Sequence, residues 1–399
     1  MSERQRLVIV GAGLAGWRAA TELRRLTPRA EIHLFGDEPE LPYDRPPLSK
    51  RVLLGNDTPR YLTDGAALAA ADIDFHCGIA VTKLHPDDRS VRCADGMSVP
   101  YDLLLLTTGS RPRVLPQAVA NDVPIRYLRR RIDAIRLRDE ITTKKELIII
   151  GGGFIGLEVA AAAAMRGCRI KIFEAGEHIL GRVAPAQVAK FIQHVHESHG
   201  STIVTSAVIR RCLSDGRRVG VELACGDIHW ADIIVAGTGI VPNVELAAAA
   251  GLKCDDGIVV DGSCRTSRPE IFAAGEVTRH PIAGYAGLRR VESWKTASEQ
   301  PRVAAQTMLG MVAQYNELPW AWSDQFDTNL QILGFPDLAI EYRLDGDHNA
   351  QRLCAMGLDA AGKVVAAFAI NDGRAISRLR RLVSIPICEQ QTKTPSTCG

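Results

Sequence analysis

The sequence lacks any apolar run long enough to span a membrane, and its N-terminus lacks the apolar core of a signal peptide. Only four apolar residues, 7–10, follow the polar start, whereas a signal peptide needs about 7–15. The ten cysteines are widely scattered, and no two of them form a C-x-x-C pair. A disulfide framework or a cysteine-rich cluster site is therefore not expected, and the reducing cytoplasm is the expected compartment.

The chain also lacks an excess of charge of one sign, because 48 basic residues stand against 46 acidic ones and the net charge is +2. This balance argues against a nucleic-acid-binding protein, although local basic patches remain compatible with it. Hydrophobic residues make up 46% and charged residues 24%, the usual mixture for a soluble globular protein. At about 150 residues per domain, the 399 residues predict two or three domains.

Two glycine-rich segments share one pattern, G-x-G-x-x-G, and each follows an apolar run typical of a buried strand. The runs are residues 7–10 and 147–150, and the segments open a helix through about residue 26 and an alanine-rich helix at 157–166. The first glycine makes the tight turn, the second lets the backbone approach a pyrophosphate at the helix N-terminus, and the third packs helix against strand. The six glycines are Gly11, Gly13, Gly16, Gly151, Gly153 and Gly156.

An acid follows the second predicted strand of each unit: Asp37 comes after residues 31–35, and Glu174 after residues 169–173. Strand, glycine turn, helix and acid in this order predict two bound dinucleotides rather than glycine-rich turns in unrelated units. Glycines or acids also follow two later predicted strands, namely Gly239 after residues 232–236 and Glu276 after residues 271–274. Ligand contacts in open α/β sheets lie at such strand ends.

These landmarks resemble the flavoprotein reductases with two dinucleotide-binding domains. Residues 41–50 (LPYDRPPLSK), 291–294 (VESW) and 320–326 (WAWSDQF) narrow the resemblance to the ferredoxin reductases of bacterial Rieske-type ring-hydroxylating oxygenase systems. The putidaredoxin and rubredoxin reductases look like close relatives, and the similarity covers nearly the whole chain. It implies an α/β fold with two Rossmann-like domains of the glutathione-reductase-like, three-layer type and a C-terminal α/β domain.

The resemblance further implies that the first glycine segment holds FAD and the second NADH. The implied FAD domain is discontinuous, 1–112 and 243–318, with an NAD domain at 113–242 and a C-terminal domain at 319–399. Residues implied to contact FAD are Ala15, Asp37, Lys50, Val81 (through its backbone), Arg129, Glu276 and Trp294. Those implied to surround NADH are Gly153, Gly156, Glu174 and Gly239. The family usually has Asp where this chain has Glu276, whose longer side chain can still accept a hydrogen bond from a ribityl hydroxyl if the backbone retreats or the rotamer folds.

Lys50 and Glu158 are the predicted catalytic pair. Glu158 follows the second glycine turn amid alanines and valines, where a buried carboxylate is costly unless it is paired. Lys50 ends a proline-stiffened loop that resembles the segment whose lysine lies beside the flavin N5, where a cation favours the reduced cofactor. In the alternative reading, Lys50 is a solvated loop residue and Glu158 only complements its helix dipole.

For several other residues the sequence leaves two interpretations of their role. Phe154 either covers the nicotinamide or fills core, and Trp294 either packs on the flavin or fills an interface. On the helix ending near Gly200, His196 and His199 could converge on a metal, but the polar segment 193–200 predicts a solvated helix end and no metal site is predicted. Two clusters of basic residues are either solvated or dock an acidic partner. These are Arg289, Arg290, Arg378, Arg380 and Arg381.

The resemblance implies transfer of electrons from NADH through FAD to a 2Fe–2S ferredoxin, expected to be acidic, that supplies a ring-hydroxylating oxygenase. A rubredoxin or P450-type ferredoxin reductase is an alternative of the same class. A disulfide or peroxide reductase would need a cysteine against the flavin, and residues 41–55 contain none. A flavoprotein that senses NADH without turnover is a further alternative.

Overall fold

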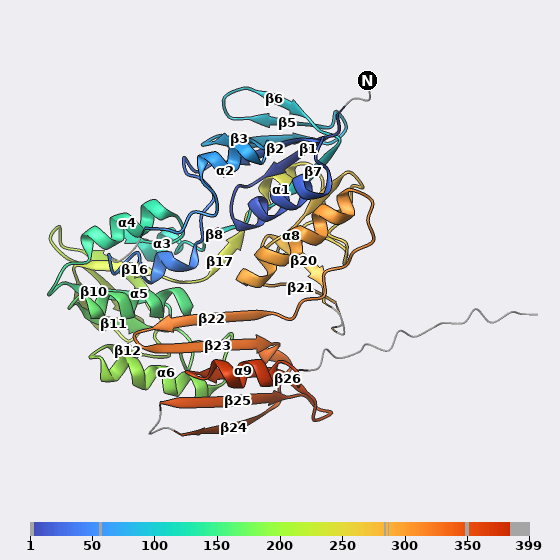
Figure 1. Ribbon diagram of the computed structural model, residues 1–399. Helices are drawn as coiled ribbons and strands as arrows, with labels where there is room; N and C mark the ends of the chain where they lie inside the picture. The colour runs from blue at the N-terminus through green and yellow to red at the C-terminus, as the bar shows by residue number, and fades with distance from the viewer. Residues whose placement is uncertain (1–3, 56–57, 283–284, 286, 348–350, 384–399) are drawn as a thin grey trace, which may run out of the picture.

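The computed structural model describes residues 4–55, 58–282, 285, 287–347 and 351–383. Three sheets of five strands each form the framework, and Figure 1 shows the two parallel sheets one above the other with the third below them. Within the described part of the chain, none of the helices is both long and apolar enough to cross a membrane. The predicted α/β fold class, with two Rossmann-like units and a C-terminal domain, is confirmed.

The first unit is a parallel sheet with β1 at its centre in the order β19-β7-β1-β2-β3. Its strands are rich in Leu, Ile and Val because both faces of a parallel sheet are covered. The register pairs Ile9 of β1 with Leu34 of β2 and with Leu105 of β7. The strands are β1 (Arg6–Val10), β2 (Glu31–Gly36), β3 (Asp74–Cys77), β7 (Leu103–Leu106) and β19 (Ile271–Ala273).

Two helices cover one face of this sheet and an antiparallel meander covers the other. Helices α1 (Leu14–Leu26) and α8 (Trp294–Met308) pack side by side on the first face, although about 270 residues separate them in sequence. The meander is β4 (Val81–His85), β5 (Ser90–Cys93) and β6 (Ser98–Pro100). Since β19 and α8 come from beyond residue 242, this unit is built from two separate stretches of the chain.

The second unit repeats the plan in the order β12-β11-β10-β16-β9, again with a meander. Helix α5 begins at Phe154, directly after the extended Gly153, rather than at the expected residue 157, so Phe154 lies in its first turn. The strands are β9 (Ile125–Arg126), β10 (Glu146–Ile150), β11 (Arg169–Phe173), β12 (Thr202–Val204) and β16 (Ile233–Ala236), with the meander β13 (Ile209–Ser214), β14 (Val219–Leu223) and β15 (Ile228–Ala231). The helices are α4 (Arg131–Glu140), α5 (Phe154–Met165) and α6 (Ala186–Ser198).

Short elements connect the units, and β8 (Ser110–Pro112) pairs antiparallel with β17 (Ile240–Pro242) where the chain crosses over and returns. Asn243 closes this crossover, because its side chain donates to Thr108 O at 2.9 Å while Thr108 Oγ1 donates to Asn243 O at 2.7 Å. The remaining short elements are η1 (Pro46–Ser49), α2 (Gly65–Ala70), α3 (Gln117–Ala120), α7 (Glu245–Ala249), β18 (Ile258–Val259), β20 (Thr278–Pro281), β21 (Leu288–Arg290) and η2 (Pro336–Leu338).

The third unit is an antiparallel sheet in the order β22-β23-β26-β25-β24, with one short helix against it. Its core is continuous with that of the second unit and with residues of the loop around η1. This shared core fixes η1, α5 and β22 relative to one another. The elements are β22 (Trp320–Gln325), β23 (Thr328–Gly334), β24 (Glu341–Asp347), β25 (Arg352–Leu358), β26 (Val364–Ile370) and α9 (Gly373–Leu379).

His196 belongs to this shared packing, and the expectation of a solvated helix end is wrong for it. Its side chain is fully buried, its Nε2 donates to Gln325 Oε1 at 2.8 Å, and its Nδ1 has no hydrogen-bond partner. His199 stacks on Phe326 with ring centroids 3.8 Å apart. The two histidines therefore contact the β22–β23 turn and pack α6 against it. Sequence periodicity could not show this contact, because the turn lies over 120 residues away.

The buried His196 makes stability depend on pH. Burial lowers the pKa of His196 from 6.5 to about 4, so between these values the unfolded chain binds more protons than the folded one. Stability is therefore full above pH 6.5 and falls as the pH drops towards 4, by about 2 kcal/mol for this group at pH 5. Between pH 7.5 and pH 5, the free energy of unfolding in urea should therefore fall by about 2 kcal/mol less in the His196→Gln variant than in the parent protein. The exposed His194→Gln control should keep the parent's dependence, and equal slopes in all three proteins would contradict the assignment.

Candidate functional site

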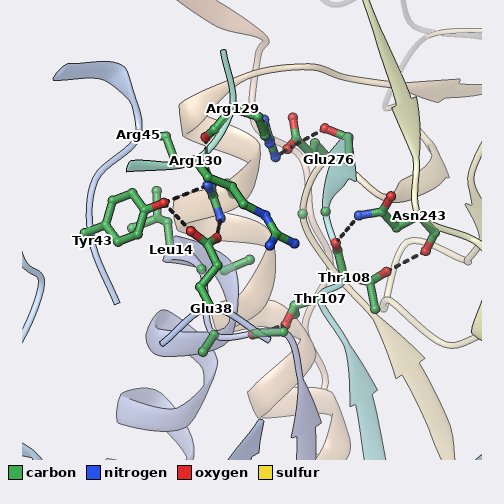
Figure 2. A pocket seen from close by; sticks show the side chains of 18 of the residues that line it. Leu14, Glu38, Tyr43, Arg45, Thr107, Thr108, Arg129, Arg130, Asn243 and Glu276 are labelled. Atoms are coloured by element: carbon green, nitrogen blue, oxygen red, sulfur yellow. Dashed lines mark hydrogen bonds and ion pairs between the residues drawn. The ribbon is translucent and has the colours of Figure 1, made fainter. Parts of the chain in front are cut away.

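A cavity of about 560 Å³ opens between the first glycine turn, the loop around η1 and the start of α5. All three units line it, because β1, α5 and β22 each contribute residues. The volume lies within the range of small-molecule and cofactor sites. Figure 2 shows the polar side chains that surround it, with a cluster of arginines and acids on one side and Thr107, Thr108 and Asn243 on the other.

In the first glycine turn, two of the three glycines have no space for a side chain and one has open space beside it. A Cβ on Gly11, whose φ is +112°, would lie 2.3 Å from Thr107 O, and a Cβ on Gly16 would lie 1.9 Å from Gly11 O. A Cβ on Gly13 would meet no atom within 4 Å, although Gly13 lines the cavity. At Gly13 no side chain covers the backbone, so a pyrophosphate could approach the N-terminus of α1 there. This is the role of the second glycine in the motif.

The second glycine turn has the same construction. A Cβ on Gly151 (φ +102°) would lie 2.6 Å from Gly237 O, and a Cβ on Gly156 would lie 2.1 Å from Gly151 O. At Gly153 the nearest atom to such a Cβ, Gly237 O, is 4.0 Å away. This turn therefore leaves a second approach for a phosphate group at the N-terminus of α5.

The acids after β2 and β11 lie beside their turns in different ways. Asp37 is half exposed, lines the cavity and forms an ion pair with Arg130. The Glu174 carboxylate accepts backbone hydrogen bonds from Gly152 N at 2.6 Å and from Gly176 N at 2.7 Å. These bonds hold its oxygens over the glycine turn, where a ribose hydroxyl would lie next to the phosphates.

Lys50 and Glu158 are brought together from different units. The Lys50 Nζ lies 2.9 Å from Glu158 Oε1, and the Glu158 side chain is only 3% exposed. Ser323 Oγ of β22 donates to the same oxygen at 2.6 Å, while Ser49 Oγ donates to Oε2. The carboxylate thus has a cation and two hydroxyl donors, the compensation that a buried charge needs. Lys50 and Glu158 both line the cavity, at the end beside Trp322.

Glu38, Tyr43 and Arg45 form a partly buried network on another wall, visible at the left of Figure 2. Arg45 contacts Glu38 Oε1 at 2.6 Å, and Tyr43 OH donates to Glu38 Oε2 at 2.6 Å. Burial raises the pKa of Tyr43 to about 12, with the Glu38 bond adding to the effect, so the phenol stays protonated. Burial alone would raise the pKa of Glu38, but Arg45, the hydrogen bond from Tyr43 and the charge of Arg130 together outweigh burial, so the pKa is lowered.

Glu276 turns its carboxylate towards protein groups rather than leaving it free. It pairs with Arg129 and accepts from Ser110 Oγ at 2.9 Å. Burial raises the pKa of Glu276, but Arg129 and Ser110 outweigh burial, so the pKa lies below its usual range. The Glu276 side chain thus reaches Arg129 from just beyond the end of β19.

The cavity collects most of the predicted FAD residues. Its lining includes Gly11, Gly13, Ala15, Asp37, Lys50, Val81, Arg129, Glu276 and Trp294, whereas Gly16 lies behind it against Gly11. The predicted NADH residues lie outside this lining: Gly151, Gly153, Gly156 and Glu174 surround the β10–α5 turn, and Gly239 follows β16. Phe154 lies between the groups, since it lines the cavity and also packs against the shared core. Together, the open glycine backbone, the arginines and the carboxylates of the cavity suit a dinucleotide, whose central pyrophosphate is anionic and whose sugars carry hydroxyl groups.

Residues that the motifs did not identify also line the cavity. They are Glu38, Tyr43, Arg45, Arg130, Asn243 and Trp322. Tyr43 and Arg45 lie within residues 41–50, where only Lys50 is predicted from the sequence as a site residue, and Trp322 lies within residues 320–326. Arg130 follows the predicted Arg129. Their roles depend on packing between loops, which no local spacing reveals.

Two of the candidate docking arginines have partners within the chain. Arg289 is bonded to Asp337 and lies 3.9 Å over the Tyr285 ring, and the nearly buried Arg290 lies 2.8 Å from Glu292. Arg378, Arg380 and Arg381 are exposed on and after α9. Among the residues that the structure describes, eight cysteines are present and none of them lines the cavity.

Comparison with known proteins gives two family matches. Residues 5–301 match the family described as pyridine nucleotide-disulphide oxidoreductase, and residues 320–394 match the one described as reductase C-terminal. The chain is 42% identical to the ferredoxin–NAD⁺ reductase component of the anthranilate 1,2-dioxygenase system from Burkholderia cepacia, over 94% of this chain and 93% of that one. It is 39% identical to rhodocoxin reductase from Rhodococcus erythropolis, over 82% and 78%.

Solved structures agree with these matches. The ferredoxin reductase for the CYP199A2 system from Rhodopseudomonas palustris superimposes with a TM-score of 0.90 at 32% identity, covering 94% of each chain. The covalent putidaredoxin reductase–putidaredoxin complex gives 0.90 at 34% identity, covering 95% of this chain and 93% of that one. The structure of a NAD-dependent persulfide reductase from A. fulgidus, at 22% identity and a TM-score of 0.86, shares the fold alone.

Proposed function

This chain belongs to the pyridine nucleotide-disulphide oxidoreductase family, whose members use a flavin and NAD(H), and from that premise we propose that it is an NADH:ferredoxin reductase. The proposed flavin is FAD, held at the first glycine turn, and the proposed electron donor is NADH, bound at the second. The proposed acceptor is a 2Fe–2S ferredoxin that supplies a ring-hydroxylating oxygenase, by analogy with the relatives named for dioxygenase systems. The proposal includes a cytoplasmic location, which rests on the scattered free thiols of the sequence.

The proposed domain boundaries are those implied by the sequence. They are 1–112 with 243–318 for FAD, 113–242 for NADH and 319–399 for the C-terminal domain, of which 384–399 lie outside the described residues. The membership of β19 and α8 in the first unit supports the discontinuous FAD domain.

One observation carries the proposal. A single cavity runs from the first glycine turn to the Lys50–Glu158 pair, and none of the described cysteines lines it. A disulfide or peroxide reductase needs a thiol beside its flavin, so this lining favours electron transfer to an external carrier.

Bound FAD would supply the conversion between the two-electron chemistry of a nicotinamide and the one-electron chemistry of an iron–sulfur cluster. The chain's own residues would bind and orient. The bare Gly13 backbone would receive the pyrophosphate, and Asp37 would accept from a ribose hydroxyl. Lys50 would place a positive charge at the inner end of the cavity, where it favours added negative charge. Glu158 pairs with that lysine, and Ser49 and Ser323 orient the Glu158 carboxylate by donating to its two oxygens.

The direct test measures cofactor and acceptor separately. The purified protein should contain one FAD per chain, and NADH should reduce it and then drive reduction of a 2Fe–2S ferredoxin. FMN, or two FAD per chain, would overturn the assignment of the two turns. Rapid reduction of glutathione, thioredoxin or peroxide with none of ferredoxin would overturn the proposed acceptor.

Charge-reversal variants assayed at low salt should locate the surface on which the ferredoxin docks. An acidic ferredoxin would meet the exposed arginines near α9, and charges on a surface are screened over about 8–10 Å at ordinary ionic strength. The Arg378→Glu/Arg380→Glu variant should raise the KM for ferredoxin by about tenfold at low salt and leave NADH–ferricyanide activity unchanged. A matched control, Lys83→Glu/Arg217→Glu, reverses two exposed charges on the meanders. Equal effects of the two double variants would remove α9 from the docking surface.

Glu174 should determine the choice of nicotinamide nucleotide. Its carboxylate, fixed by Gly152 N and Gly176 N, can accept from a ribose 2′-hydroxyl and repel a 2′-phosphate. We expect NADH to be strongly preferred and the ratio of kcat/KM for NADH over NADPH to fall by about tenfold or more in Glu174→Ala. Glu177→Gln, which alters an exposed acid of the same loop, is the control and should leave the ratio unchanged. Comparable kcat/KM values for both nucleotides in the parent enzyme would contradict the assignment.

A further inference from the structure

Two histidines and an aspartate converge at the edge of the first sheet, away from the cavity lining. His33 lies on β2, and Asp74 and His76 lie on the neighbouring edge strand β3. The parallel register pairs His33 with Asp74 and Phe35 with His76, so alternate side chains of both strands project from one face. This is the face covered by the β4–β6 meander, because Phe35 belongs to that core.

Three ligand-type atoms face one another there. His33 Nδ1 lies 3.0 Å from His76 Nε2 and 3.1 Å from Asp74 Oδ2, and His76 Nε2 lies 3.3 Å from the same Oδ2. In a tetrahedral zinc site with bonds of about 2.0–2.1 Å, neighbouring ligand atoms are about 3.3 Å apart. The triangle of side-chain atoms is therefore close to one face of such a tetrahedron.

The outer contacts orient His33 for ligation. Its Nε2 lies 2.8 Å from Glu31 Oε1, and Arg6 Nε holds the other Glu31 oxygen at 3.0 Å. A carboxylate that accepts from one ring nitrogen leaves the lone pair of the other nitrogen for a metal, the arrangement found behind metal-bound histidines. Phe35 stacks on the His76 ring with centroids 4.1 Å apart and so fixes its plane.

Hydrogen bonds alone satisfy this triangle poorly. His33 Nδ1 and the Asp74 carboxylate oxygen both face His76 Nε2, and they also face each other at 3.1 Å. When His33 Nε2 donates to Glu31, Nδ1 of the neutral ring carries a lone pair, and a single N–H at His76 Nε2 cannot serve both this nitrogen and the Asp74 oxygen. A cation at the centre would satisfy all three atoms at once.

We propose that His33, Asp74 and His76 bind a divalent transition-metal ion, with zinc as the preferred occupant and water as its fourth ligand. Two imidazoles and one carboxylate suit zinc better than calcium or magnesium, which require mainly oxygen ligands. Asp74 is 60% exposed, so the ion enters from solvent beside the carboxylate. The ion joins β2 to the edge strand β3 and closes the sheet at that edge. Because none of the three ligands lines the dinucleotide cavity, its role is structural.

The test uses untagged holoenzyme that has been treated with a chelator and then titrated with zinc or cobalt. We expect one equivalent of zinc per chain by elemental analysis and a rise in Tm that grows with free zinc, as binding to the folded state requires. Cobalt should give d–d absorption without a thiolate charge-transfer band, because two nitrogens and an oxygen are the protein ligands.

Two variants and a control make the outcome decisive. His76→Gln and the milder Asp74→Asn, whose side chain is mostly exposed, should each weaken zinc binding by about tenfold or more and abolish the zinc-dependent rise in Tm. His85→Gln changes a histidine of the covering meander outside the cluster and should bind like the parent. Equal zinc affinity in the parent and in both variants would overturn the proposal, as would a cobalt spectrum with a thiolate band.

Discussion

The Gly13→Ala variant should fold normally and purify almost free of flavin. Gly13 has φ −76°, which alanine adopts without strain, and the added methyl meets no protein atom within 4 Å. The methyl enters the space beside the N-terminus of α1, where the pyrophosphate of FAD would approach the backbone. We expect the FAD content to fall by about tenfold or more, measured as the ratio of flavin absorbance to protein, with an unchanged far-UV circular dichroism spectrum.

The Gly153→Ala variant provides the complementary result. It should keep its flavin and raise the KM for NADH, because Gly153 (φ −83°) is the corresponding open position of the second turn. Gly65→Ala, at an exposed glycine that also has open space, is the control for the substitution itself. Loss of flavin in Gly153→Ala with full flavin in Gly13→Ala would exchange the cofactors of the two turns.

Local patterns predict the parts of this molecule whose geometry is local. A strand, a glycine turn and a helix are consecutive in sequence, so spacing along the chain is enough to place Gly11 and Gly151 with their neighbours. Lys50 and Glu158 can be named as a pair because a carboxylate amid alanines needs a partner. Even there, the contribution of Ser323 is not visible in the sequence, since it depends on how β22 of the third unit packs on α5.

Features that depend on packing between distant segments escape sequence reasoning. The polar helix end predicts a solvated His196, yet Gln325 and Phe326 bury it from another unit. The ligand triangle around His33 also leaves no sequence motif, because about 40 residues separate it from Asp74 and only the strand register aligns them. In both cases the deciding quantity is a tertiary distance, and spacing along the chain does not contain it.

Breaking the Lys50–Glu158 pair from either side should be costly, and breaking both sides should cost less. Lys50→Met leaves a carboxylate that is 3% exposed without its cation, and Glu158→Gln leaves a lysine that is 15% exposed without its counter-charge. Each single change should lower the free energy of unfolding by about 3–5 kcal/mol, because the remaining charge is buried unpaired. The double variant should regain a large part of that loss. Urea unfolding of the four proteins gives the coupling free energy directly.

The same cycle separates a structural pair from a catalytic one. If Lys50 tunes the bound flavin, Lys50→Met should lower the flavin midpoint potential and Glu158→Gln should raise it, by about 30 mV for each 1.4 kcal/mol of a two-electron couple. Lys145→Met, which removes a more exposed lysine 3.5 Å from Asp232, is the control and should cost about 1 kcal/mol or less without moving the potential. Shifts of the same sign in both single variants would contradict an electrostatic role, because the two charges are opposite. A large stability coupling with an unchanged potential would assign the pair to fixing η1, α5 and β22 relative to one another, without an electrostatic effect on the flavin.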